Sequence, residues 1–130
     1  MKTRLTNYFS KSIMVLSGVF LTVSVLFVIA AFALGRYTIA FFYADWNLNC
    51  REAKPIIESV VSSYNNVRLV EINIDQPDAP GQARSLGLYL PRSIPQIYVL
   101  DSSNKVVAEF TYTGESAQQL KARLDNIVLR

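Results

Sequence analysis

The hydrophobic positions divide the chain into one long apolar run and a second part with short alternating segments. From Ser12 to Gly35, twenty-four consecutive residues carry no charge. A helix rises ~1.5 Å per residue and the hydrocarbon core of a bilayer is ~30 Å thick, so about twenty residues can cross it. The pattern therefore predicts a transmembrane helix over residues 12–35 and one folded domain over residues 36–130.

Charges on either side of the apolar run predict its orientation. Residues 1–36 contain four basic side chains and no acidic one, and three of the four precede the run. Because cytoplasmic segments are enriched in Lys and Arg, residues 1–11 are expected to be a cytoplasmic tail. The chain is thus predicted to be a single-pass membrane protein that contacts the lipid bilayer through residues 12–35. Its domain would lie on the periplasmic or lumenal side.

A cleaved signal peptide is the alternative interpretation of the same run. Ala31-Phe32-Ala33 is an A-x-A pattern, and cleavage after Ala33 would give a secreted domain. The run is longer than the ~7–15 residues of a secretory apolar core, and cleavage would leave almost no chain before the first strand. A retained signal anchor is therefore preferred, although both interpretations deliver the domain to the same compartment.

The second part of the chain alternates strands with helices. Tyr37–Tyr43 is almost wholly apolar, which is typical of a strand buried on both faces. Apolar residues three and four apart predict a helix over Asn49–Tyr64. The other expected elements are a strand at Val67–Ile74, a weaker helix at Ala79–Leu88, strands at Ile97–Leu100 and Val106–Tyr112, and a last helix after Gly114.

Local sequence signals predict one turn and the start of one helix. Asp101–Asn104 has the composition of a hairpin turn, and Ser116 with Gln119 forms the pattern of a capping box. The order is strand, helix, strand, helix, strand, strand, helix. This order predicts an α/β fold with a mixed four-stranded sheet, because the alternating part is parallel and the final hairpin antiparallel, with helices on both faces.

Composition argues against several classes of function. Residues 37–130 carry nine basic and ten acidic side chains, so the overall charge of +3 arises from the N-terminal segment. No basic face for nucleic acid is predicted on the domain. The chain has no histidine and one cysteine, and its five glycines are dispersed. Neither a metal site nor a phosphate-binding loop is therefore expected, and no cofactor is predicted.

Four local features resemble the thioredoxin superfamily. Phe42–Trp46 resembles the strand exit before the redox motif, and Trp46-Asn47-Leu48-Asn49-Cys50 stands where the family has W-C-x-x-C. Pro55 matches the proline that kinks the active-site helix, and Ser93-Ile94-Pro95 matches the loop whose cis proline faces the motif. With the element order, the resemblance implies a short-form thioredoxin-like fold over residues 36–130, similar to membrane-tethered thioredoxin-like proteins of thylakoids and bacteria.

The same resemblance implies that the dithiol chemistry of the family has been lost. The family's nucleophile is the first cysteine of the motif, and this chain has Asn47 there, whose amide cannot attack a disulfide. Cys50 takes the place of the second, resolving cysteine and has no partner in the chain. Where many thioredoxins bury a carboxylate this chain has Phe41, and Glu71 corresponds to the lysine often paired with that carboxylate.

One functional hypothesis is a binding module. In the family, the backbone before the cis proline pairs with an extended substrate segment, a form of strand addition. Ile94 and Pro95, together with the neighbouring apolar Trp46 and Leu48, are therefore predicted to bind client proteins. The expected clients are extended segments of membrane or translocated proteins during assembly or maturation.

The second hypothesis is a thiol–disulfide oxidoreductase that acts through the single thiol of Cys50. This residue is expected in the first turn of a helix, where the helix dipole favours a thiolate, with Arg51 and Lys54 nearby. The alternative interpretation of Cys50 is a small buried residue kept for packing. Asn47 and Asn49 also have a structural interpretation, because asparagine is a good N-cap for the following helix.

Overall fold

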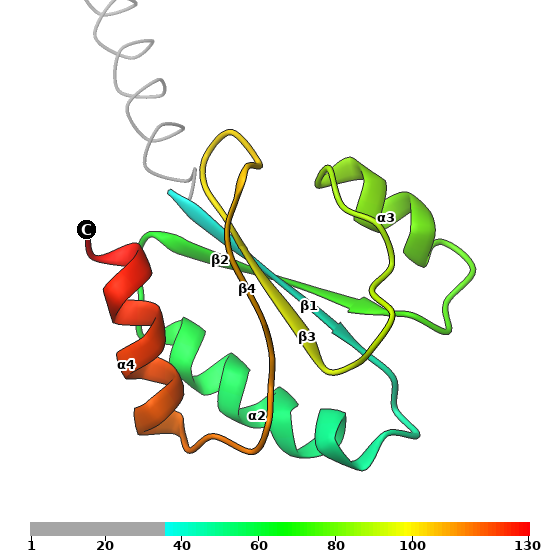
Figure 1. Ribbon diagram of the computed structural model, residues 1–130, viewed down its shortest axis with the longest axis horizontal. Helices are drawn as coiled ribbons and strands as arrows, with labels where there is room; N and C mark the ends of the chain where they lie inside the picture. Colours follow the sequence, from blue (N-terminus) through cyan, green and yellow to red (C-terminus); the bar gives the residue numbers. More distant parts are fainter. Residues whose placement is uncertain (1–35) are drawn as a thin grey trace, which may run out of the picture. The chain divides into compact units, whose positions relative to one another are not determined.

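The structure is a computed structural model that describes residues 36–130 (Figure 1). The predicted cytoplasmic tail over residues 1–11, the predicted transmembrane helix over residues 12–35 and the A-x-A pattern ending at Ala33 lie outside the described residues. Within residues 36–130, no helix has the length and the apolar character needed to cross a bilayer.

The described residues form the predicted series of elements. These are β1 (Tyr37–Tyr43), α2 (Leu48–Ser62), β2 (Val67–Asn73), α3 (Ala79–Ser85), β3 (Gln96–Leu100), β4 (Val106–Thr111) and α4 (Ala117–Val128). The sheet has the strand order β2-β1-β3-β4, with β1 parallel to β2 and antiparallel to β3, and β3 antiparallel to β4. The predicted α/β fold with a mixed four-stranded sheet is therefore confirmed.

Strand β1 forms the centre of the domain. It pairs with β2 on one side and β3 on the other, and six of its seven residues are buried. Because successive side chains of a strand point to opposite faces, β1 contributes to two separate cores. Ile39 and Phe41 belong to one cluster, and Ala40 and Phe42 belong to the other. The continuous apolar run Tyr37–Tyr43 follows from this two-sided burial.

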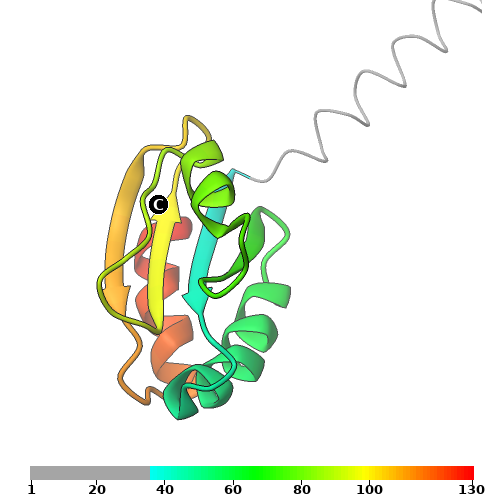
Figure 2. The same ribbon diagram turned by 90° about the vertical axis from the view of Figure 1, so that its right-hand side faces the viewer.

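Helices cover both faces of the sheet, as predicted (Figure 2). Helices α2 and α4 pack on one face, where Ile57 and Leu124 join the first cluster. Helix α3 packs on the other face, where Ala79 and Ala83 join the second. Two short alanine side chains on α3 allow this short helix to approach the sheet closely.

Helix ends agree with the local sequence signals in one case and differ in another. The capping box is confirmed, because the Ser116 Oγ accepts from the Gln119 N–H at 3.3 Å and the Gln119 Oε1 accepts from the Ser116 N–H at 2.9 Å. Helix α3 ends at Ser85, three residues before the predicted end at Leu88. Gly87 has a φ of +74°, a conformation that stops a right-handed helix and that glycine adopts without strain.

The register of the central strands determines which loops meet. Phe42 of β1 pairs with Gln96 of β3, and β1 and β3 are antiparallel. The segment that leaves β1 toward α2 and the loop that enters β3 therefore lie at the same end of the sheet. This end carries all of the sequence-predicted site residues.

Candidate functional site

The turn between β1 and α2 places Asn47 at the start of the helix. Its side-chain Oδ1 accepts a hydrogen bond from the backbone N–H of Cys50 at 3.0 Å, and its backbone is extended (φ −85°, ψ 120°). Asn47 is therefore the N-cap of α2, whereas Asn49 lies inside the helix. The side chain at the position expected for the nucleophile therefore accepts a hydrogen bond from a free N–H group in the first turn of α2. Its amide offers no group that attacks sulfur.

Cys50 is a free thiol in the first turn of α2, as predicted, but it is buried. Its exposed fraction is 1 %. Burial raises the pKa of the Cys50 thiol, a hydrogen bond from the backbone of Ala44 acts in the opposite direction, and the carboxylate of Asp45 raises the pKa further. The thiol therefore stays protonated at neutral pH to a greater extent than an ordinary cysteine.

Lys54 does not act on Cys50 in the way that the sequence suggested. Its Nζ lies 3.7 Å from Oε1 of Glu71 and donates a hydrogen bond to the Tyr43 hydroxyl at 3.4 Å. The same ammonium lies 4.6 Å from the centre of the Tyr43 ring. This cation is therefore engaged by β1 and β2, and the charged group that shifts the pKa of the Cys50 thiol is the acidic Asp45.

The position opposite Glu71 on β1 is apolar. Phe41 and Glu71 are partners across the β1–β2 pairing, and Phe41 is fully buried, with its ring centre 5.4 Å from that of Tyr43 in a stacked arrangement. Burial raises the pKa of the Glu71 carboxyl, which Lys54 partly counteracts. The carboxylate and the ammonium thus lie on β2 and α2, and the β1 position holds no proton acceptor.

Two polar links fix the motif turn to the end of β2. The Trp46 indole N–H donates to the Asp75 carboxylate at 2.9 Å, and the Asn73 side-chain amide donates to the Asp45 carboxylate at 3.0 Å. Trp46 is nevertheless 68 % exposed, and Leu48 is 59 % exposed. The link to Asp75 holds the Trp46 ring on the surface rather than in the core. Asp45 and Asp75 were not predicted as site residues, and their positions just after β1 and β2 are the only sequence signal of this pairing.

The Ile94–Pro95 loop lies at the same end of the sheet. The Ile94–Pro95 peptide bond is cis, the form that the resemblance implied. Pro95 is buried and its carbonyl accepts from the Tyr112 N–H at 3.1 Å, so its side chain supports the loop and is not available to a client. Ile94 is half-buried, and within residues 36–130 its backbone N–H and C=O have no hydrogen-bond partner.

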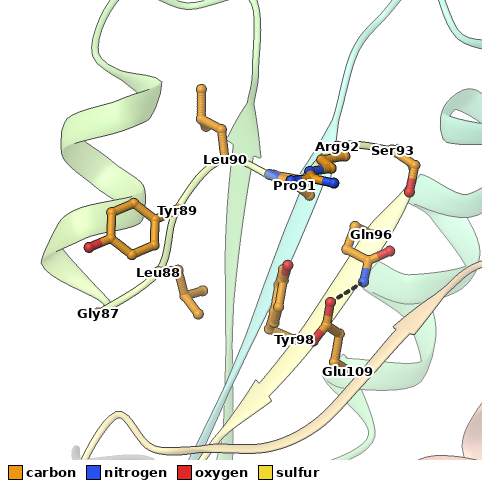
Figure 3. A pocket seen from close by; sticks show the side chains of 10 residues that line it. All are labelled: Gly87, Leu88, Tyr89, Leu90, Pro91, Arg92, Ser93, Gln96, Tyr98 and Glu109. Carbon is orange, nitrogen blue, oxygen red and sulfur yellow. Dashed lines mark hydrogen bonds between the residues drawn. The ribbon is translucent and has the colours of Figure 1, made fainter.

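A groove that was not predicted from the sequence adjoins this loop (Figure 3). It has a volume of about 410 Å³ and lies between the segment Gly87–Ser93 and the strands β3 and β4. On its floor, Gln96 donates to the Glu109 carboxylate at 3.0 Å and accepts from the Thr111 hydroxyl at 2.7 Å. Within residues 36–130, no group of three potential ligands is placed to hold a metal ion.

Comparisons with known proteins agree with this geometry. Among solved structures, a thioredoxin variant from Halobacterium salinarum is similar at 20 % identity, with a TM-score of 0.56 over 72 % of this chain and 76 % of that one. Thioredoxin O2 from Arabidopsis thaliana in its oxidised state gives 19 % identity, a TM-score of 0.56 and the same coverages. Thioredoxin-2 of the malaria parasite, described as a component of its protein secretion machinery, gives 18 % identity and a TM-score of 0.54 over 69 % and 82 % of the two chains.

No curated protein matches the chain significantly. At these identities the solved structures establish the fold. The family itself is established by the sequence, because the family model described as "Thioredoxin" matches residues 34–126, well over half of the chain. The chain therefore belongs to the thioredoxin family.

Proposed function

We propose that this protein is a membrane-anchored member of the thioredoxin family that binds extended segments of client proteins and does not carry out dithiol exchange. The observation that carries the proposal is the role of Asn47. At the position where the family's attacking cysteine is expected, its amide oxygen caps α2 at 3.0 Å from the Cys50 N–H. An amide forms no mixed disulfide, so the site keeps the shape of a redox site without its nucleophile.

The surface beside Asn47 supports binding. Trp46 and Leu48 expose most of their apolar side chains at the end of the sheet where the Ile94 backbone has no partner within residues 36–130. An extended segment has free N–H and C=O groups that pair with such a backbone, and apolar side chains beside it add affinity. In this proposal Trp46 and Leu48 contact the client, Ile94 pairs with its backbone, and Pro95 holds the loop.

Removing the exposed apolar side chains should weaken client binding. Aromatic anchors carry much of the binding energy at interfaces, so we expect Trp46→Ala to lower the affinity at least about tenfold and Leu48→Ala by less. The measurement is the fluorescence anisotropy of a labelled, unfolded and thiol-blocked client titrated with the purified chain. Because such a client has no reactive sulfur, any binding is independent of thiol exchange.

Leu129→Ala is the matched control for this experiment. Leu129 is 64 % exposed, close to the 59 % of Leu48, but it follows α4 at the other end of the sheet. Its truncation should leave the affinity unchanged. Equal affinities for the wild type, Trp46→Ala and Leu48→Ala would contradict the proposed client surface.

A monothiol oxidoreductase is the second candidate, favoured by one observation. Cys50 lies in the first turn of α2, where the helix dipole stabilises an anion. Burial and Asp45 oppose this effect and raise the pKa of the Cys50 thiol. We therefore expect Cys50 in the native protein to react with a disulfide reagent at neutral pH at least about tenfold more slowly than in urea.

The measurement is the pH dependence of the labelling rate of Cys50, with and without urea. A raised pKa places the rise of the native rate above the pH at which the unfolded thiol ionises. The Cys50→Ser variant gives the background of the assay. Fast native labelling that saturates below neutral pH would instead support the monothiol enzyme.

Membrane anchoring is the remaining part of the proposal. Its support is the run of twenty-four uncharged residues over residues 12–35 with basic side chains before it. The anchored chain should stay with membranes after alkaline extraction, with its domain on the periplasmic or lumenal side. A soluble product that begins at Leu34 would instead show cleavage after Ala33.

A further inference from the structure

We propose that the end of the domain at which β1 begins is a membrane-contact face that binds anionic phospholipid headgroups. The inference rests on the proposed anchor and adds the surface by which the domain meets the bilayer. We call this end the entry face. It is defined by exposed residues from five segments, namely Arg36, Arg68, Lys105, Val107, Leu129 and Arg130.

Strand pairing brings the basic side chains of the entry face together. Arg36 precedes β1, and its guanidinium lies 5.6 Å from the centre of the Tyr37 ring. Arg68 of β2 is opposite Thr38 and donates to its hydroxyl at 3.3 Å. Thr38 also pairs with Leu100, the last residue of β3, so the β3–β4 turn that carries Lys105 lies at this end.

The last residues of α4 complete the entry face. Tyr37, Val107, Ile127 and Arg130 line one hollow of about 380 Å³, which joins the start of β1 to β4 and the end of α4. Leu129 beside it is 64 % exposed and Val107 is 43 % exposed. Figure 1 shows the start of β1, the β3–β4 turn and the end of α4 at the same end of the ribbon. Exposed apolar side chains among basic ones are typical of a surface that meets lipid headgroups.

The acidic groups near these elements have partners within the domain. The Asp101 carboxylate accepts from the backbone N–H groups of Ser103 and Lys105 at 2.8 and 3.0 Å, and it therefore stabilises the turn. Asp125 of α4 is paired with Lys121 at 2.9 Å. The Asp125–Lys121 pair is neutral as a whole, whereas Asp101 keeps its negative charge. The four basic side chains of the entry face outnumber this one carboxylate, and they are complementary to an anionic surface.

The short stretch of chain before β1 indicates that this partner is the bilayer. The uncharged run ends at Gly35, and β1 begins at Tyr37, so only Arg36 separates them. Consecutive Cα atoms are about 3.8 Å apart, so a run that spans the membrane holds Tyr37 within about 8 Å of its end. The entry face then meets the headgroup layer, where each basic side chain strengthens binding to anionic lipid roughly fivefold.

The test uses the full chain reconstituted in vesicles of phosphatidylcholine, alone or mixed with phosphatidylglycerol. In a Cys50→Ser background, an environment-sensitive dye is attached through Leu129→Cys or through Asn49→Cys, which lies at the other end of the domain. We expect a spin-labelled lipid to quench the dye at residue 129 at least about fivefold more strongly than the dye at residue 49. Adding phosphatidylglycerol should increase this quenching, and salt should reverse the increase.

Charge variants assign the effect to the entry face. Arg68→Gln, Lys105→Gln and Arg130→Gln combined should remove the dependence on phosphatidylglycerol. The matched control combines Arg51→Gln, Arg92→Gln and Arg123→Gln, which removes the same charge elsewhere and should leave the dependence in place. Equal quenching at both dyes, or an equal effect of the two triple variants, would overturn the proposal.

Alkaline extraction of the same vesicles separates this inference from the anchor. If the chain is retained but the two dyes behave alike, the anchor holds and the entry face is wrong. If the chain is extracted, the anchor fails, and the same labelled chain is then sedimented with vesicles added from outside. Salt-sensitive binding to phosphatidylglycerol that the entry-face triple variant abolishes would still support the face, and the absence of binding would overturn it.

Discussion

Asn47→Cys should reduce insulin disulfides in the presence of dithiothreitol at least about tenfold faster than the wild-type chain, because it restores an attacking thiol. The Asn47 Oδ1 lies 3.0 Å from the Cys50 backbone N–H, so a sulfur at residue 47 would lie close to the backbone of Cys50 at the start of α2. The new thiolate attacks the insulin disulfide and forms a mixed disulfide. Cys50 then displaces the reduced substrate, and dithiothreitol reduces the disulfide left between positions 47 and 50.

Two variants test whether the gain needs both sulfurs. Asn47→Ser keeps a side-chain oxygen that can cap α2 but adds no thiol, so it should show the wild-type rate. Asn47→Cys combined with Cys50→Ser should trap the mixed disulfide and turn over slowly. If Asn47→Cys stays at the wild-type rate while its far-ultraviolet circular dichroism is native, the site has lost more than its nucleophile.

Phe41→Ala should lower the free energy of unfolding by about 3–5 kcal/mol, the cost of truncating a fully buried aromatic side chain. Phe41 is 0 % exposed and belongs to the cluster between the sheet and helices α2 and α4, where its ring stacks on Tyr43. The cavity left by alanine cannot be closed by β1 itself, since the strand is held by partners on both sides. The measurement is urea unfolding monitored by circular dichroism.

Phe41→Asp tests the chemistry of the same position. It restores the carboxylate found in many relatives, but it places a charge among apolar side chains, with Lys54 already bound to Glu71. We expect it to be at least as destabilising as Phe41→Ala. Val106→Ala, at a 40 % exposed position on β4, is the control and should change stability by no more than about 0.5 kcal/mol. A Phe41→Asp protein as stable as the wild type would contradict this expectation.

The sequence predicted the fold well where a local pattern of residues corresponds directly to buried side chains or to local hydrogen bonds in the structure. The uninterrupted apolar run Tyr37–Tyr43 indicated a two-sided central strand, and β1 contributes to both cores. Helix α4 begins where the Ser116–Gln119 capping box predicted it. This prediction was reliable because both hydrogen bonds of the box join residues only three apart in the sequence. The end of α3 was predicted less well, since apolar residues continue to Leu88 while Gly87 turns the backbone out of the helix.

The positions of single site residues were predicted from the sequence, but the contacts between distant site residues were not. Asn47 as N-cap and Cys50 in the first turn followed from residues close in sequence. The link between Trp46 and Asp75 joins residues far apart in the chain, and the pairing of Lys54 with Glu71 depends on how α2 lies over β2. The groove beside Gly87–Ser93 depends on the path of a loop. Such features follow from tertiary packing, which hydrophobic periodicity does not encode.

The exposed indole of Trp46, hydrogen-bonded to Asp75, makes the proposed client surface optically observable. Trp46 is the only tryptophan in the chain, so the tryptophan emission of the protein comes from a single indole. That indole is mostly in solvent, with its N–H on a carboxylate. A ligand that covers the ring removes water from it and shifts the emission to shorter wavelength, so occupancy can be followed on the unlabelled, unmodified protein.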